Sequence, residues 1–174
     1  MKKEEKQTGP LDKKLAAVCG LFCPACTVFI GTKEDQERLK VIAQRVQRPV
    51  EELLCHGCRS EKQCYYSKSI CTMAKCAIDK GIDFCGQCPE YPCKNLRSFQ
   101  AELPHRIELW KSQERIKEAG YEKSYAEMTE YYSCPVCGAM NSAYDLKCRK
   151  CGKEPSCNYV SKRRQAIEQY LKNR

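Results

Sequence analysis

Two Cys-x-x-Cys pairs close together near the C-terminal end constrain this sequence more than any other feature. The pairs are Cys134 with Cys137 and Cys148 with Cys151, and a glycine follows each pair directly. One such turn presents two thiolates to a metal ion, and two facing turns complete a tetrahedral four-cysteine site. The glycines let the backbone turn tightly beneath the sulfurs. The spacing predicts a structural zinc site of the ribbon type, with no open ligand position for catalysis.

The cellular compartment decides whether the other cysteines are cross-linked by disulfides or by metals. The chain has 174 residues, of which 16 are cysteine. Its N-terminus is polar with no apolar leader, and no apolar run reaches transmembrane length. We therefore expect a cytoplasmic protein without membrane association, whose reduced thiols bind metal. Free thiols or disulfides are the alternative, but they would leave the close pairing of the cysteines unexplained.

The net charge is a weak guide to partners. The formal charge is +9 when every thiol is counted as neutral. A four-cysteine zinc site adds −2, so three such sites would leave about +3. The basic C-terminal run of Lys162, Arg163 and Arg164 remains a local positive patch. Nucleic-acid binding is therefore possible through these three residues, but the overall charge alone does not predict it.

Eleven further cysteines lie between residues 19 and 93. The Cys-x-x-Cys pairs among them, beginning at positions 23, 55 and 85, are the best nuclei for metal sites. Two four-cysteine sites would leave three cysteines over, and three sites would need one more ligand. All eleven are expected as candidate ligands: Cys19, Cys23, Cys26, Cys55, Cys58, Cys64, Cys71, Cys76, Cys85, Cys88 and Cys93.

The metal in this N-terminal region is left open between zinc and iron–sulfur clusters. Zinc is favoured because the dense bacterial ferredoxin motif is absent. His56 could be a nitrogen ligand, although a residue between two ligands of one turn more often points away from their metal. Cys71 and Cys76 are five residues apart, so one of them could be a buried thiol. Cys157 has no near partner and is interpreted as a spare thiol. The Cys19-x₃-Cys-x₂-Cys spacing also occurs in radical S-adenosylmethionine enzymes, which need a longer barrel than this chain provides.

Apolar periodicity predicts a mostly helical chain. Helices are expected over residues 33–47 (capped by Thr32), 71–80 (closed by Gly81), 93–102, 104–119, 121–132 and 159–174. The fold class is an α-rich, metal-stabilised, cysteine-rich domain with few short strands, followed by a zinc-ribbon β-hairpin module and a terminal helix. The expected divisions are a disordered tail at 1–14, a cysteine-rich metal-binding domain at 15–103, a helical connector at 104–132, and the ribbon with its basic C-terminal helix at 133–174.

The order of the cysteine signatures resembles one known family. The signatures are Cys19-Gly-Leu-x-Cys-x-x-Cys, Cys55-x-Gly-Cys, Cys71-x₄-Cys-Ala and Cys85-x-x-Cys-x-x-Tyr-Pro-Cys. They are similar to those of the bacterial and archaeal "domain of unknown function 3795" family, over about residues 15–100. Longer members of that family also carry a C-terminal ribbon. The resemblance implies an architecture and bound metal, but no reaction.

Three classes of function fit these observations. The first is a zinc-stabilised adaptor that binds an unknown protein partner, and it is the one the sequence favours. The second is a nucleic-acid-binding zinc-ribbon protein, and the third is an iron–sulfur or redox protein that uses the N-terminal cysteines. The sequence has no phosphate loop, nucleophile elbow or metallohydrolase signature, which favours a role other than catalysis. Its two histidines, His56 and His105, have no catalytic motif around them.

Overall fold

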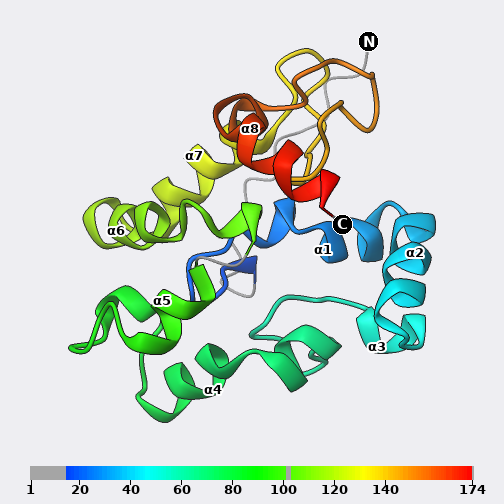
Figure 1. Ribbon diagram of the computed structural model, residues 1–174. Helices are drawn as coiled ribbons and strands as arrows, with labels where there is room; N and C mark the ends of the chain where they lie inside the picture. The colour runs from blue at the N-terminus through cyan, green and yellow to red at the C-terminus, as the bar shows by residue number, and fades with distance from the viewer. Residues whose placement is uncertain (1–14, 101–102, 174) are drawn as a thin grey trace.

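The computed structural model describes residues 15–100 and 103–173 of the chain. The expected tail at residues 1–14 lies outside the described residues. In Figure 1 the first described segment and α1 lie near the centre. Helices α6 and α7 are on one side of them, α2 and α3 on the other, and α4 and α5 below. The loops of the C-terminal cysteines and α8 lie above. The α-helices are α1 Thr27–Lys33, α2 Gln36–Val46, α3 Val50–Leu53, α4 Thr72–Asp79, α5 Lys94–Gln100, α6 Leu109–Ala119, α7 Tyr121–Tyr132 and α8 Asn158–Lys172.

Residues 16–28 form the centre of the molecule because they contribute to four separate hydrophobic clusters. Val18 packs with residues of α4, α5 and α6. Ala25 packs with α7 and α8, and Val28 packs with α2 and α3. Ala16 packs with Phe84 and with the start of α7. The segment that carries the first cysteine signature is therefore the part of the core on which the helices assemble.

A buried glutamine on α6 holds this central segment to η4, a short 3₁₀ turn at Cys85–Gln87. Gln113 is 1% exposed, and its amide nitrogen donates to Val18 O at 3.0 Å. Its amide oxygen accepts from Gly86 N at 2.7 Å. Gly20 approaches the same side chain so closely that a Cβ there would lie 2.8 Å from its nitrogen, and its φ is +90°. The clamp satisfies buried polar groups that would otherwise destabilise the core.

Most of the expected helices are present, but two of them begin later than expected. The helix expected over residues 33–47 is α2, which begins only at Gln36 and is capped by Asp35, whose side chain accepts from Arg38 N at 3.1 Å. The predicted cap Thr32 donates to Val28 O within α1 and accepts from Cys55 N. Gly81 closes α4 as expected, with φ +62°. The first turn after Pro104 is the short 3₁₀ turn η5 (Pro104–Arg106), so α6 begins later than expected.

The predicted β-hairpin is wrong. Within residues 15–100 and 103–173, extended pairing is limited to two isolated bridges, Ala16 with Phe22 and Ser133 with Met140. Each cysteine turn closes on itself, since Cys134 N donates to Ala139 O at 2.9 Å. Part of the backbone between the two turns bonds to side chains, as where Ser142 N donates to the Asp145 carboxylate at 2.7 Å. The region is a pair of turns, not a ribbon of strands.

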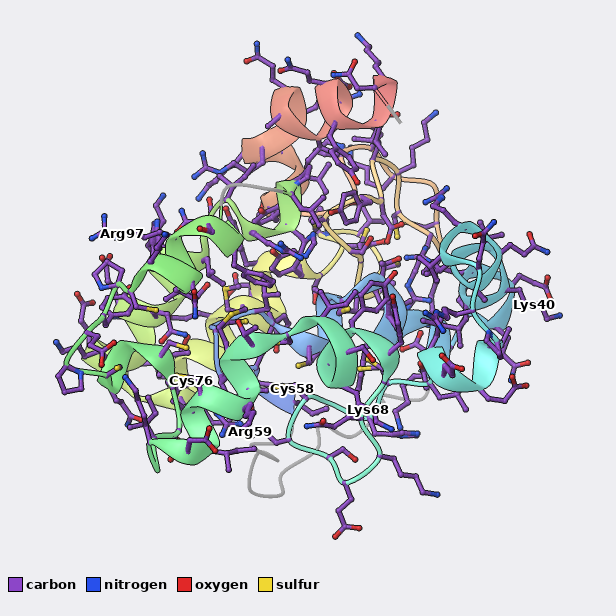
Figure 2. All side chains as sticks on the ribbon, turned by 60° about the horizontal axis from the view of Figure 1, so that its bottom comes forward. Lys40, Cys58, Arg59, Lys68, Cys76 and Arg97 are labelled. Carbon is purple, nitrogen blue, oxygen red and sulfur yellow. The ribbon has the colours of Figure 1, made fainter. Side chains whose placement is uncertain are left out.

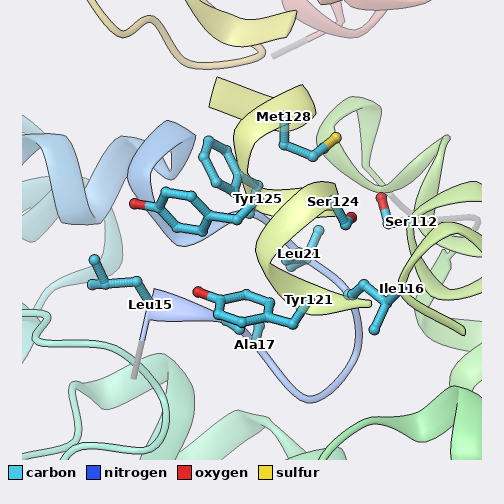
Figure 3. Close-up of a pocket in the computed structure, with 12 residues that line it drawn as sticks. Leu15, Ala17, Leu21, Ser112, Ile116, Tyr121, Ser124, Tyr125 and Met128 are labelled. Atoms are coloured by element: carbon cyan, nitrogen blue, oxygen red, sulfur yellow. The ribbon is translucent and has the colours of Figure 1, made fainter. Parts of the chain in front are cut away.

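Helix α7 covers the start of the central segment and leaves a small cavity there. Figure 3 shows Tyr121, Ser124, Tyr125 and Met128 from α7 around Leu21. The cavity has a volume of about 20 Å³. A space of this size holds about one water molecule, so it is a packing gap and not a substrate site. None of the helices in the described ranges is long and apolar enough to span a membrane.

Candidate metal centre

The two C-terminal cysteine pairs have the same local geometry. Gly138 N donates to Cys134 O, and Gly152 N donates to Cys148 O, both at 2.9 Å. The two glycines have φ values of +71° and +74°. Only glycine adopts this left-handed region at little cost, so it lets each turn reverse beneath its pair of sulfurs. The sequence prediction for these turns is confirmed.

The four sulfurs of these turns converge on one point. Cys134 Sγ lies 3.6 Å from Cys151 Sγ, and Cys137 Sγ lies 3.6 Å from Cys148 Sγ. All four ligand atoms lie within 4.8 Å of one another. A tetrahedral ion with metal–sulfur bonds of about 2.3 Å would place its sulfurs about 3.8 Å apart. The cluster therefore has the dimensions of a four-thiolate site for a single metal ion.

Asn141 connects the two turns and was missed in the sequence. Its side chain is fully buried, and its amide nitrogen donates to Ala139 O at 2.8 Å and lies 3.8 Å from Cys148 Sγ. Its amide oxygen accepts from Arg149 N at 3.1 Å. One side chain thus bonds to the backbone of both turns and reaches a sulfur. The sequence signal for this role is weak: it is an asparagine between the two Cys-x-x-Cys pairs, at no characteristic spacing from them.

The thiols differ in how readily they ionise. Burial raises the pKa of Cys148, but the backbone amides of Cys151 and Lys150 and the neighbouring thiols lower it to about 6. The Lys153 amide lowers the pKa of Cys151, yet burial and the other thiolates raise it to about 12. A site with some thiolates already formed attracts a cation, and binding must then displace the remaining protons.

The four-cysteine turns are attached to α2 by charged side chains. Arg38 on α2 donates to both carboxylate oxygens of Asp145, at 3.0 and 3.1 Å. Both side chains are mostly buried, 17% and 14% exposed. Arg149 pairs with Glu34 and donates to Met140 O at 2.6 Å. A bidentate, partly buried pair of this kind fixes orientation, so the metal centre is held against the N-terminal half.

The eleven N-terminal cysteines are arranged differently. In the part of the chain that the structure describes, the C-terminal four are the one group of three or more such residues whose ligand atoms converge on a metal position. Cys55 and Cys64 are buried beside each other near α2 and α3, and the Cys55 thiol lowers the pKa of Cys64 by hydrogen bonding. Cys19 and Cys23 are buried against α4 and α6. Their assignment as ligands, like that of the other N-terminal cysteines and His56, stays a prediction.

The cysteines Cys76, Cys85, Cys88 and Cys93 line one cavity near α4 and α5. Cys157, expected as a spare thiol, is 1% exposed and packs beneath α8. The structure forms no disulfide among its described residues, which include all sixteen cysteines. The thiols are therefore available for metal binding.

The basic C-terminal run is largely paired within the chain. Arg163 binds Glu108 at 2.6 Å. Arg164 lies between Glu154 and Glu168, and the ammonium of Lys162 lies over the Tyr131 ring, 5.0 Å from its centroid. These contacts hold α8 to the preceding helices and offset part of the positive charge that was considered for nucleic-acid binding.

Residues 15–98 match the model of the family described as Protein of unknown function (DUF3795). This segment belongs to that family. The resemblance seen in the sequence is thereby confirmed, and the DUF3795 segment contains all eleven N-terminal cysteines. The four-cysteine centre lies outside it. No curated protein and no solved structure matches the chain significantly.

Proposed function

We propose that this protein is a zinc-binding structural protein, in which Cys134, Cys137, Cys148 and Cys151 hold one zinc ion and the folded chain acts as an adaptor for another protein. The observation that carries the proposal is the convergence of the four sulfurs, which all lie within 4.8 Å of one another, with two pairs across the site 3.6 Å apart. Four thiolates in a tetrahedral set are typical of structural zinc, and they leave no position for a substrate.

The zinc in this centre is tested by counting zinc per chain in a ligand variant. Cys137 is exposed, so Cys137→Ser removes a ligand with little effect on the core. We expect it to lose one equivalent of zinc relative to the wild type. The matched control is Cys157→Ala, which removes a cysteine outside the site and should keep the full zinc content. Unchanged zinc in Cys137→Ser would contradict the proposal.

A cytoplasmic adaptor role is supported by the chemistry of the chain. Reduced thiols require a reducing compartment, and the closed ligand set gives the metal a structural role. The exposed side chains of Val136, on the first cysteine turn, and Ile78, on α4, are apolar surface that a protein partner could cover; they are 67% and 72% exposed. The ion pairs of Arg163 and Arg164 favour a protein partner over nucleic acid, because paired arginines release fewer counterions from phosphate.

The choice between these partner classes is tested by titrating the zinc-loaded protein with duplex DNA and with RNA at two salt concentrations. The adaptor proposal expects no binding at low salt. If binding does occur and weakens steeply with salt, the variant Lys162→Ala/Arg163→Ala/Arg164→Ala should flatten the slope by up to about 3 × 0.9 for duplex DNA. That pair of results would replace the adaptor with a nucleic-acid-binding protein.

A further inference from the structure

A second set of four cysteines surrounds a cavity in the DUF3795 segment. Cys76 lies on α4, Cys85 begins the η4 turn, Cys88 caps that turn and Cys93 directly precedes α5. All four line the same cavity, whose volume is about 210 Å³. In Figure 2 Cys76 lies across the molecule from Lys40 on α2, the helix that contacts the zinc centre. In Figure 1 α4 and α5 lie below the central segment and the loops of the C-terminal cysteines lie above it, so the cavity is separate from the four-cysteine turns.

The size of this cavity differs from what a single ion needs. In the proposed zinc centre all four sulfurs lie within 4.8 Å of one another and enclose one position. The cysteines of the cavity do not form such a convergent group among the described residues. A guest the size of one water needs only about 10–15 Å³, so a cavity of about 210 Å³ is far larger than a single ion requires. An iron–sulfur cluster binds its thiolates through different iron atoms, and it therefore holds them farther apart than one ion does.

Backbone hydrogen bonds and core packing fix the segments that carry these four cysteines. Cys85 N donates to Val18 O at 2.8 Å, which fixes the η4 turn on the central segment. Cys88 N donates to Cys85 O, and Arg97 N donates to Cys93 O, both at 3.0 Å. Helices α4 and α5 are anchored in one core cluster through Met73 and Leu96 among others. Closing the four sulfurs onto one ion would require these packed elements to move together, which a close-packed core resists.

The polar groups around the cavity suit a cluster with a net negative charge. Lys80 Nζ lies 3.4 Å from Cys88 Sγ and 2.7 Å from the Glu90 carboxylate. Tyr91 also lines the cavity, and its hydroxyl is buried without a hydrogen-bond partner in the ranges 15–100 and 103–173. A buried hydroxyl without an acceptor is costly, and the sulfur of a cluster would supply one.

We infer that Cys76, Cys85, Cys88 and Cys93 hold an iron–sulfur cluster, separate from the zinc centre. The four thiols become thiolate ligands when the cluster is inserted, and their protons pass to solvent. Lys80 donates to the Cys88 sulfur from outside, and Tyr91 is placed to donate to the cluster from within. Among the metals considered for the eleven N-terminal cysteines, iron–sulfur is thus assigned to these four.

The test is to measure iron, acid-labile sulfide and zinc per chain in full-length protein purified without oxygen and reconstituted with ferrous iron and sulfide. We expect iron and sulfide in equal amounts, two or four of each per chain, and broad visible charge-transfer absorption. Cys88→Ser should lose most of the iron and sulfide and keep the zinc of the other centre. Cys137→Ser should show the opposite result. Zinc in place of iron in the reconstituted protein, or full iron in Cys88→Ser, would overturn the inference.

Two milder variants keep the inference testable if Cys88→Ser does not fold. Tyr91→Phe and Lys80→Met each preserve most of the side-chain volume and all four thiols. Each should keep the cluster but lower its reduction potential, because one donor to the cluster sulfurs is lost. The matched control is Lys75→Met, which alters an exposed lysine of α4 paired with Asp79. Unchanged potentials in both cavity variants, or an equal shift in the control, would contradict the proposed contacts.

Discussion

The C-terminal turns and the DUF3795 segment use cysteine in opposite ways. In the turns the four thiols are close in sequence, and hydrogen bonds within each turn bring the sulfurs together. In the DUF3795 segment the thiols are spread over residues 19–93 and lie within or beside the hydrophobic core. The first arrangement needs little help from the rest of the fold. The second exists only when several helices have already packed around the central segment.

This difference indicates whether bound metal or hydrophobic packing stabilises each region. The core cluster beside the C-terminal turns is small and consists of Cys134, Ala139 and Cys148. Such a core stabilises a fold only weakly, so a metal must supply much of the free energy. The cysteines of the DUF3795 segment pack with large apolar side chains, including Leu39, Leu53, Leu96 and Leu109. That segment should therefore keep its fold when a metal is removed.

Removing the proposed zinc ion from the C-terminal turns should produce the largest effect, and it should be local. Binding at a structural four-cysteine site contributes on the order of 10 kcal/mol, so a chelator should lower amide protection over residues 134–157 by orders of magnitude. Protection in α2 and α6 should change little, because the clusters around Leu39 and Leu109 remain. Hydrogen exchange of zinc-loaded and chelated protein measures both regions in one experiment. Equal loss of protection throughout would show that the two regions unfold as one unit.

Zinc affinity at the C-terminal turns should fall as the pH falls. The ion needs four thiolates, so binding displaces every proton that the free site still carries. Near neutral pH Cys148, with its pKa lowered to about 6, is already ionised, whereas Cys151, with its pKa raised to about 12, must lose a proton. Fewer than four protons are released, and each contributes about tenfold per pH unit. The dependence should become steeper below about pH 6, where Cys148 also carries a proton.

Competition titrations with a zinc chelator of known pH dependence, from pH 8 to pH 5.5, would measure this slope. A matched titration of Asn141→Asp tests the buried side chain beside Cys148. The new carboxylate would lie near the thiolates, and its negative charge should lower the zinc affinity below that of the wild type at each pH. An affinity that does not change with pH would contradict the assignment of protonated thiols to the free site.

The contrast also explains how much of the fold the sequence could predict. Helix α7 at residues 121–132 and the end of α4 at Gly81 were predicted because apolar periodicity and capping are local signals. The start of α2 was wrong because both Thr32 and Asp35 can cap a helix. Only the packed structure shows that Thr32 is used by α1 and by Cys55 N. The central role of residues 16–28 depends on contacts with seven helices, α2 to α8, which no local pattern encodes.

The same reasoning separates the two cysteine regions. The C-terminal centre was predicted from spacing alone, since a Cys-x-x-Cys turn fixes its own sulfurs. The β-hairpin was wrongly added because the backbone between the turns bonds to the Asn141 and Asp145 side chains rather than to a second strand. The grouping of Cys76 with the cysteines of η4 depends on how α4 packs against α5. Spacing could name these residues as candidate ligands, but it could not show which of them share a cavity.

The Arg38–Asp145 pair, which attaches the C-terminal turns to α2, should contribute less to the free energy of unfolding than the bound metal does. Asp145→Asn removes the charge that Arg38 binds with two hydrogen bonds, and it leaves a mostly buried guanidinium with Asp35 as its remaining carboxylate partner. We expect a loss of roughly 1–3 kcal/mol in the free energy of unfolding of the zinc-loaded protein. The matched control is Asp79→Asn, which breaks the exposed Lys75–Asp79 pair and should cost about 0–1 kcal/mol. Denaturant unfolding measures both, and equal losses would show that the attachment to α2 is no stronger than a surface pair.

The smallest expected effect is an acid-sensitive contact between the helical part and the cysteine turns. His105 Nδ1 is hydrogen-bonded to the Tyr144 hydroxyl, which lies between the two cysteine pairs. Burial lowers the pKa of His105 to about 3, with the Arg106 charge adding to the shift. The unfolded chain binds a proton near pH 6.5 while the folded chain does not, so this contribution is complete above that pH and is lost as the pH falls towards 3. The loss amounts to about 1.4 kcal/mol per pH unit once the unfolded histidine is protonated.

His105→Asn keeps a polar group near Tyr144 but cannot take up this proton. Between pH 7 and pH 5.5 its stability should therefore fall less steeply than that of the wild type, as measured by denaturant unfolding at fixed excess zinc. Since both proteins have the same zinc ligands, the difference between their slopes isolates the histidine, and identical slopes would mean that His105 titrates equally in the folded and unfolded chains.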